Sequence, residues 1–119
     1  MKRAALVGRA LGALLLLAGA AAVRAQPDDE RLGRALLERY HCGSCHAIPG
    51  VAAARGTLAA SLHAYGRRSY IAGRVANEPA TLARWIVDPA SIVPGTLMPN
   101  LGVSIDDARV MARYLGRLE

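Results

Sequence analysis

Three segments of the chain place their apolar residues at the spacing of an α-helix. Residues 29–41 begin with acidic side chains, which favour a helix N-terminus, and continue with apolar residues three or four positions apart. Residues 79–87 start with a proline in the first turn and end before an Asp-Pro step, which stops a helix. Residues 104–118 show the clearest pattern, because Ser104 and Asp107 form a capping-box-like start ahead of an apolar stripe.

The segments between these helices are rich in residues that form turns. Residues 50–78 combine many Ala and Gly with scattered Arg, and we expect mostly irregular chain with short helical turns. Residues 94–102 hold two Pro and two Gly within nine positions, which predicts a loop. No stretch alternates between apolar and polar residues for long enough to predict a sheet.

The first 25 of the 119 residues have the pattern of an export signal. Two basic residues precede an apolar run over residues 10–23, and small or apolar residues stand where a signal peptidase cleaves. This pattern predicts a signal peptide over residues 1–25 and a mature domain over residues 26–119. The alternative is an uncleaved membrane anchor, although the 14 apolar residues are short against the roughly 20 that span a bilayer.

Removing this leader changes the charge balance of the protein. Of 15 Lys and Arg, four lie in residues 1–25, so 11 remain against 9 Asp and Glu, a net charge of +2. Nucleic-acid binding needs a dense basic surface, so we expect no nucleic-acid partner. The remaining domain is small and has no Phe, so a cofactor, a metal or a partner is expected to complete its core.

The only two cysteines of the chain lie in Cys42-Gly43-Ser44-Cys45-His46, a C-x-x-C-H pattern. In a helical turn Cys42, Cys45 and His46 share one face, because they lie three and four positions apart. Two thiols at this separation can add to the two vinyl groups of one haem, and the histidine then lies under the iron. The pattern predicts one covalent haem c on Cys42 and Cys45, with its iron bound by His46.

Three other chemistries use two cysteines at this spacing. A structural zinc ion needs two more ligands, and only His41 and His63 are available. A thiol–disulfide redox pair is the stronger alternative in an exported protein, but that chemistry typically follows a strand, whereas here an amphipathic helix precedes the motif. A structural disulfide would close a very short loop and add little stability.

A haem that transfers electrons needs a second axial ligand, for which the chain offers Met98, Met111, His41 and His63. Met111 lies on the apolar face of the last predicted helix and is expected to be core. His41 adjoins the motif on the side of His46 and does not readily reach the opposite side of the iron. Met98 lies in the Pro/Gly loop 52 residues after His46, far enough for the chain to pass around the haem. We predict Met98 as the second ligand and keep His63 as the alternative.

In these features the sequence resembles class I monohaem cytochromes c of the bacterial periplasmic type, over nearly the whole of residues 26–119. It is also similar to the cytochrome c modules that accompany, or are fused to, respiratory terminal oxidases. The residues that carry the resemblance are Gly33, Tyr40, the CGSCH motif, Gly66-Arg67-Arg68, the L-x-x-W-I-x-D-P stretch at 82–89, Pro94-Gly95-Thr96-Leu97-Met98-Pro99 and Tyr114.

The resemblance implies a small all-α fold in which three to five helices wrap around one covalent haem c. It implies that Gly33 lets the first helix cross the last one closely near Tyr114. It also implies His46 and Met98 as the axial iron ligands of an electron carrier that is not an enzyme and has no catalytic residues.

One stretch departs from the family pattern. The family has Gly-Pro-x-Leu after the haem motif, and the proline carbonyl accepts a hydrogen bond from the axial histidine. The matching residues here are Ala59-Ala60-Ser61-Leu62. The carbonyl of Ala60 can still accept this bond from His46, but the rigidity of the proline is lost.

The family also suggests residues that hydrogen-bond the haem propionates, and the candidates here are Arg67, Arg68, Tyr70 and Trp85. The alternatives are an exposed basic loop for the arginines and core packing for Trp85. Residues 55–84 carry five Arg against a single Glu, a local charge of +4 that neutralises propionates, steers an acidic redox partner, or does both.

The predicted function is transfer of one electron in the periplasm, to or from redox partner proteins of the respiratory chain such as a terminal oxidase. The first alternative is a haem c subunit of a larger oxidase or dehydrogenase complex. Two further alternatives are a haem protein whose Met98 dissociates to admit peroxide or small gases, and a thiol oxidoreductase without haem. Contact with a membrane is expected only through an uncleaved leader or a membrane complex.

Overall fold

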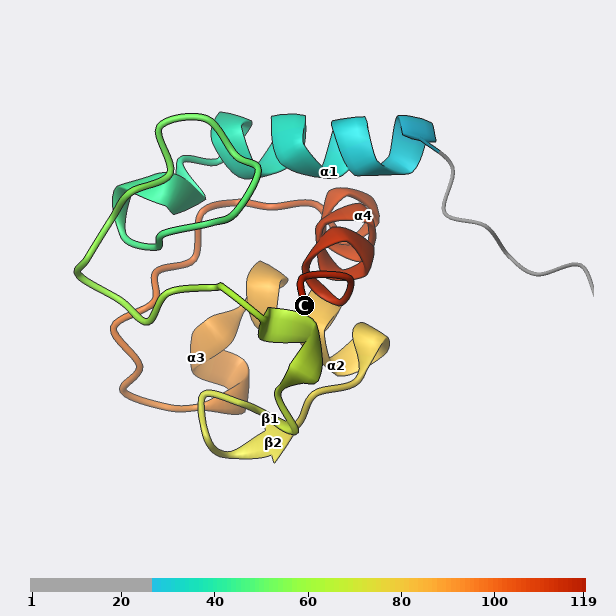
Figure 1. The fold of residues 1–119 in the computed structure, drawn as a ribbon. Coiled ribbons are helices and arrows are strands. Elements are labelled where there is room, and N and C mark those ends of the chain that lie inside the picture. Colours follow the sequence, from blue (N-terminus) through green and yellow to red (C-terminus); the bar gives the residue numbers. More distant parts are fainter. Residues whose placement is uncertain (1–26) are drawn as a thin grey trace, which may run out of the picture.

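The computed structural model describes residues 27–119, which contain four α-helices and a two-stranded hairpin (Figure 1). Two short 3-10 helices lie in the long connection between the first helix and the hairpin. In chain order the elements are α1 (Pro27–Arg39), η1 (Cys42–Ser44), η2 (Tyr65–Arg67), β1 (Tyr70–Ile71), β2 (Val75–Ala76), α2 (Pro79–Val87), α3 (Pro89–Ile92) and α4 (Ile105–Leu115).

The predicted leader over residues 1–25 lies outside the described residues, so cleavage and anchoring both stay predictions. Within residues 27–119, no helix is both long enough and apolar enough to cross a membrane.

Helices α1 and α4 cross at close range, with α1 lying over one side of α4 (Figure 1). Gly33 on α1 is buried at the crossing, and a Cβ atom there would lie 2.6 Å from Cβ of Tyr114 on α4. The Tyr114 hydroxyl donates a hydrogen bond of 2.7 Å to the carbonyl of Pro49, which ties the connection after α1 to α4. The close crossing expected at Gly33 and Tyr114 is therefore present.

Polar bonds join the two ends of this crossing. At one end the Tyr40 hydroxyl donates to Oδ2 of Asp107 at 2.7 Å, and this bond, together with burial, raises the pKa of Tyr40. At the other end Nε of Arg113 lies 3.2 Å from Oδ2 of Asp29. The Arg113–Asp29 pair is well exposed to water, so it contributes little to stability.

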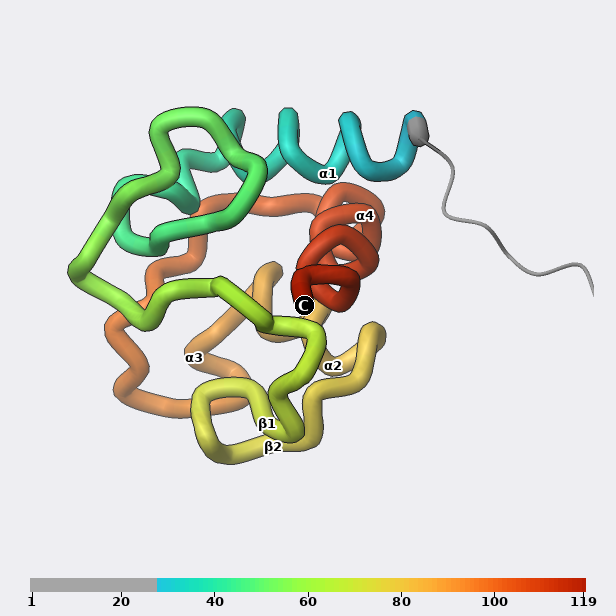
Figure 2. The backbone as a smooth tube through the Cα atoms, in the orientation of Figure 1, coloured from blue at the N-terminus to red at the C-terminus, as the bar shows by residue number. Residues whose placement is uncertain are grey.

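Helix α2 packs on α4 and supplies much of the remaining core (Figure 2). The apolar stripe predicted for α4 is buried, since Ala108 and Met111 are 0% exposed and Leu115 is 4% exposed. On α2 the buried residues are Leu82, Ala83, Trp85 and Ile86. The N-terminus of α4 is capped as predicted, because Oγ of Ser104 accepts a hydrogen bond from the Asp107 N–H at 3.1 Å.

The prediction of an all-α fold, with three to five helices around a haem, is wrong. Only 46% of the described residues are helical, and β1 pairs with β2 as an antiparallel hairpin in which Ile71 faces Val75. Strands of two residues are too short to show an alternating pattern, so no pattern in the sequence predicted them. The hairpin turn relies on positive φ at Ala72 and Gly73, and Ala is an uncommon residue at such a position.

The helix boundaries differ from the predictions by a few residues. The helix expected over 29–41 begins two residues earlier and ends at Arg39, and the one expected over 104–118 ends at Leu115. The helix expected over 79–87 has these bounds, and Pro89 begins the separate short helix α3. Residues 94–102 contain no helix or strand, as predicted.

We expect Gly33→Ala to destabilise the protein by about 1–3 kcal/mol, because the added methyl group would overlap Tyr114 and force the two helices apart. Thermal unfolding followed by circular dichroism measures this loss. As a control on the same helix, Arg31→Ala removes only an exposed ion pair and is expected to change stability by less than about 0.5 kcal/mol. Equal melting temperatures for Gly33→Ala and the unsubstituted protein would contradict the close crossing.

Candidate haem-binding pocket

An apolar pocket lies between α1, α2, α4 and the loop before α4, with a cavity volume of about 60 Å³ and an opening to solvent. Its lining consists of Leu37, Cys42, His46, Leu62, Tyr65, Leu82, Trp85, Ile86, Met98, Leu101, Val103, Met111 and Leu115. Three of the four predicted haem contacts, Cys42, His46 and Met98, therefore line one pocket.

A larger hollow, of about 550 Å³, runs along the outer side of α1 and is lined by different kinds of side chain. It is lined mainly by charged side chains, among them Arg31, Arg34 and Glu30. Arg34 pairs with Glu30, and both side chains are about half exposed to water. None of the predicted cofactor contacts reaches this hollow, so the apolar pocket is the better candidate site.

The C-x-x-C-H segment forms a tight turn directly after α1. The backbone N–H groups of Cys45 and His46 both donate to the carbonyl of Cys42, so the motif forms a helical turn, as predicted. His41 starts this turn in the left-handed region, with φ of 56°. Gly43 allows the next loop to pack on the turn, because a Cβ atom there would lie 2.6 Å from Cα of Ala54.

A hydrogen bond from the imidazole ring holds the side chain of His46 in one orientation. Nδ1 of His46 lies 2.6 Å from the carbonyl oxygen of Ala60. A carbonyl can only accept a hydrogen bond, so Nδ1 carries the proton and donates it. This bond selects the tautomer that leaves Nε2 free, and Nε2 is the atom that histidine then offers to a metal. The hydrogen bond to Ala60 that the family resemblance implied is present without the proline.

Met98 lies in the loop over residues 94–102, half-buried, and its side chain lines the pocket. The loop is braced locally, since the Met98 N–H donates to Oγ1 of Thr96 at 3.2 Å. Of the other candidate ligands, His41 and His63 are exposed and lie outside the pocket lining. Met111 also lines the pocket, but it is fully buried in the core of α4, as predicted.

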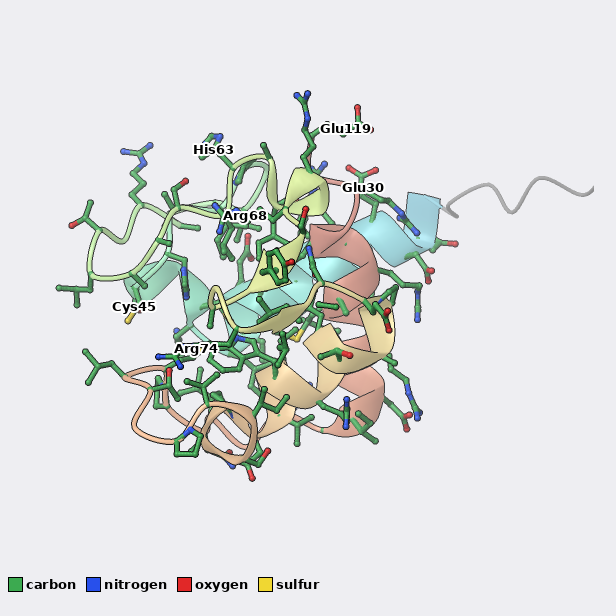
Figure 3. The ribbon with its side chains drawn as sticks, turned by 90° about the horizontal axis from the view of Figure 1, so that it is seen from below. Glu30, Cys45, His63, Arg68, Arg74 and Glu119 are labelled. Carbon is green, nitrogen blue, oxygen red and sulfur yellow. The ribbon has the colours of Figure 1, made fainter. Side chains whose placement is uncertain are left out.

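Cys42 and Cys45 differ in their surroundings. Cys42 lines the pocket, and burial raises the pKa of its thiol, with a smaller contribution from the nearby Cys45. Cys45 is half-buried and lies at the edge of the molecule (Figure 3). Thiols that carry out disulfide exchange have a lowered pKa, so the raised pKa of Cys42 argues against the thiol oxidoreductase alternative.

Among residues 27–119, no three His, Cys, Asp or Glu side chains gather as a metal site, which a zinc ion would require.

Of the four residues proposed to face the propionates, only Trp85 lines the pocket. Arg67 and Tyr70 are exposed, and Arg68 stacks its guanidinium on the ring of Tyr65 at 5.2 Å from the centroid. Tyr65 is a pocket residue that sequence reasoning missed, and burial raises its pKa. Its large aromatic side chain, within a stretch rich in Ala and Gly, was the feature of the sequence that could have indicated a buried position.

The chain is similar to two bacterial oxidase subunits. It is 34% identical over 88 residues to cytochrome c oxidase subunit 2 of Alkalihalophilus pseudofirmus, which covers 73% of this chain and 25% of that protein. It is 29% identical over 92 residues to cytochrome c oxidase subunit 2 of Bacillus subtilis (strain 168), covering 76% of this chain and 26% of that protein. This chain thus spans about a quarter of the length of these relatives. No protein-family model and no solved structure matches it.

These matches correct one prediction made from the sequence. We expected a protein that is not an enzyme, but both relatives are subunits of an oxidase, which is an enzyme. The expectation followed from the family resemblance and its pair of iron ligands. Predicted ligands of one electron-carrying centre carry no information about the assembly to which that centre belongs.

We expect Ala60→Pro to stabilise the protein by about 0.4–1 kcal/mol, since proline restricts the unfolded chain and leaves the carbonyl that His46 uses. Within the described residues the Ala60 N–H makes no backbone hydrogen bond and φ of Ala60 is not positive, so little is lost in the folded state. Ala59→Pro is the matched control and should destabilise, because the Ala59 N–H donates to the Cys45 carbonyl at 3.0 Å. Chemical denaturation compares the two, and a destabilised Ala60→Pro would contradict this description of the loop.

Proposed function

We propose that this protein is a haem c component of a respiratory oxidase, in which it transfers one electron at a time. The observation that supports the proposal is that Cys42, His46 and Met98 line a single apolar pocket. Bound there, haem c supplies an iron that changes between the ferric and ferrous states.

The residues present fit this group in three respects. The pocket offers an apolar lining for the porphyrin, with Leu37, Trp85 and Leu115 among its walls. The free Nε2 of His46 offers one axial ligand and the thioether of Met98 another. Cys42 lines the pocket and Cys45 follows three residues later in the same turn, so both thiols are available for attachment.

Each part of the pocket has a role in electron transfer. The bond from His46 to Ala60 fixes the imidazole and makes it a stronger electron donor to iron. Met98 in place of a second histidine favours the ferrous state and raises the potential. If His46 and Met98 both held the iron of haem c, little room would remain for a substrate there, which suits a site that passes electrons.

The oxidase context rests on the relatives. Both are cytochrome c oxidase subunit 2, and the similarity extends over about three quarters of this chain. This favours a subunit or module of a terminal oxidase complex over a freely diffusing periplasmic carrier. In either form the predicted export signal would place the domain on the periplasmic side, with electron donors and acceptors as its partners.

The axial assignment is tested with Met98→Ala. We expect this variant to lose the sulfur–iron charge-transfer band of the oxidised protein and to bind added cyanide or carbon monoxide readily near neutral pH. Met111→Leu is the matched control, because it removes the other methionine of the pocket at similar volume and should keep the band. A band that persists in Met98→Ala would exclude Met98 as a ligand.

A further inference from the structure

The segment that accepts the hydrogen bond from His46 is anchored at both ends to the C-x-x-C-H turn. The Ala59 N–H donates to the Cys45 carbonyl at 3.0 Å, and the Leu62 N–H donates to the Ala47 carbonyl at 2.8 Å. Within the described residues, the N–H groups of Ala60 and Ser61 make no backbone hydrogen bonds. The two peptides in the middle of the segment therefore need another support, and no proline supplies it here.

Arg68 supports the segment next to these peptides. Nη2 of Arg68 donates a hydrogen bond to the carbonyl of Ser61, the residue after the one that His46 contacts. A guanidinium donor makes this a charge-assisted bond, which is stronger than a bond between neutral groups. Two successive carbonyls of the segment thus accept side-chain hydrogen bonds, that of Ala60 from His46 and that of Ser61 from Arg68. The Ser61–Leu62 peptide is held on both sides, because its N–H also bonds to the Ala47 carbonyl.

Arg68 is itself held firmly, so it can act as a fixed support. Its guanidinium lies over the ring of Tyr65, which is buried and lines the pocket. Its N–H bonds to the Tyr65 carbonyl at 3.0 Å, and its carbonyl accepts from Nδ2 of Asn77 at 2.9 Å. Asn77 follows β2, so the hairpin fixes the backbone from which the Arg68 side chain extends.

We propose that Arg68 is a positioning residue for His46, replacing with a hydrogen bond the rigidity that a proline at position 60 would give. Arg68 holds the carbonyl of Ser61 and so restrains the Ser61–Leu62 peptide. This limits rotation of the adjoining Ala60–Ser61 peptide, whose carbonyl bonds to the imidazole. The consequence for the iron rests on the proposed function, whereas the effect on the His46 ring does not.

The test measures hydrogen exchange of the His46 Nδ1 proton by NMR on the full chain as it is purified. We expect Arg68→Ala to accelerate this exchange about tenfold, the factor expected for losing about 1.4 kcal/mol of hydrogen bonding. Arg67→Ala removes the same charge from the adjacent, exposed residue and should leave the exchange unchanged. Arg68→Lys keeps a charged donor of similar reach and should preserve most of the slow exchange.

A double substitution separates this role from a direct contact with a propionate. If Arg68 acts through the loop, Ala60→Pro should remove most of the effect of Arg68→Ala, both on proton exchange and on the reduction potential. A propionate contact instead predicts that Arg68→Ala shifts the potential equally in both backgrounds and leaves the exchange unchanged, which would overturn the proposal. Equal acceleration by Arg67→Ala would also overturn it. A protein purified without haem fails the proposed function, yet its His46 exchange still decides the role of Arg68.

Discussion

The structure depends on an apolar pocket that the protein's own side chains leave open. Helices α1, α2 and α4 turn apolar residues toward this space, and the core has no Phe to fill it. Leaving such a surface exposed to water is unfavourable, because burial of apolar area is the main stabilising contribution in a small domain. If haem c binds there as proposed, its porphyrin would cover these walls and add to the buried apolar area.

Several hydrogen bonds around the pocket fix the orientation of the His46 imidazole. His46 donates to Ala60, the ends of the Ala59–Leu62 segment bond to the C-x-x-C-H turn, and Arg68 braces its middle. Tyr114, which packs on Gly33 at the helix crossing, also donates to the carbonyl of Pro49, three residues after this turn. The helix crossing, the loop and the imidazole thus form one continuous set of contacts.

The sequence predicted most local features well, with the hairpin as the exception. The three longer helices, the cap at Ser104 and the loop around Met98 depend on spacing and turn residues within a few positions, and these signals are visible in one sequence. The β1–β2 hairpin was missed because each strand is two residues long and its turn contains Ala72 at positive φ.

Some residues of the pocket could be predicted from the sequence and others could not. Cys42, His46 and Met98 were identified because their chemistry is specific, whereas Tyr65 and Leu101 line the pocket only through the path of a long irregular connection. The support that Arg68 gives to the Ser61 carbonyl was likewise invisible, since a side chain bonding to a distant backbone carbonyl leaves no pattern in the sequence. Membership of an oxidase is a property of the relatives and not of any one residue.

The most direct test of the central claim is the mass of the tryptic peptide that carries both cysteines, residues 40–55, isolated from protein made in a host that attaches haem c. This account predicts a peptide heavier than its amino acids by one haem, with neither Cys42 nor Cys45 reacting with a thiol reagent. A peptide of unmodified mass with two reactive thiols would contradict it.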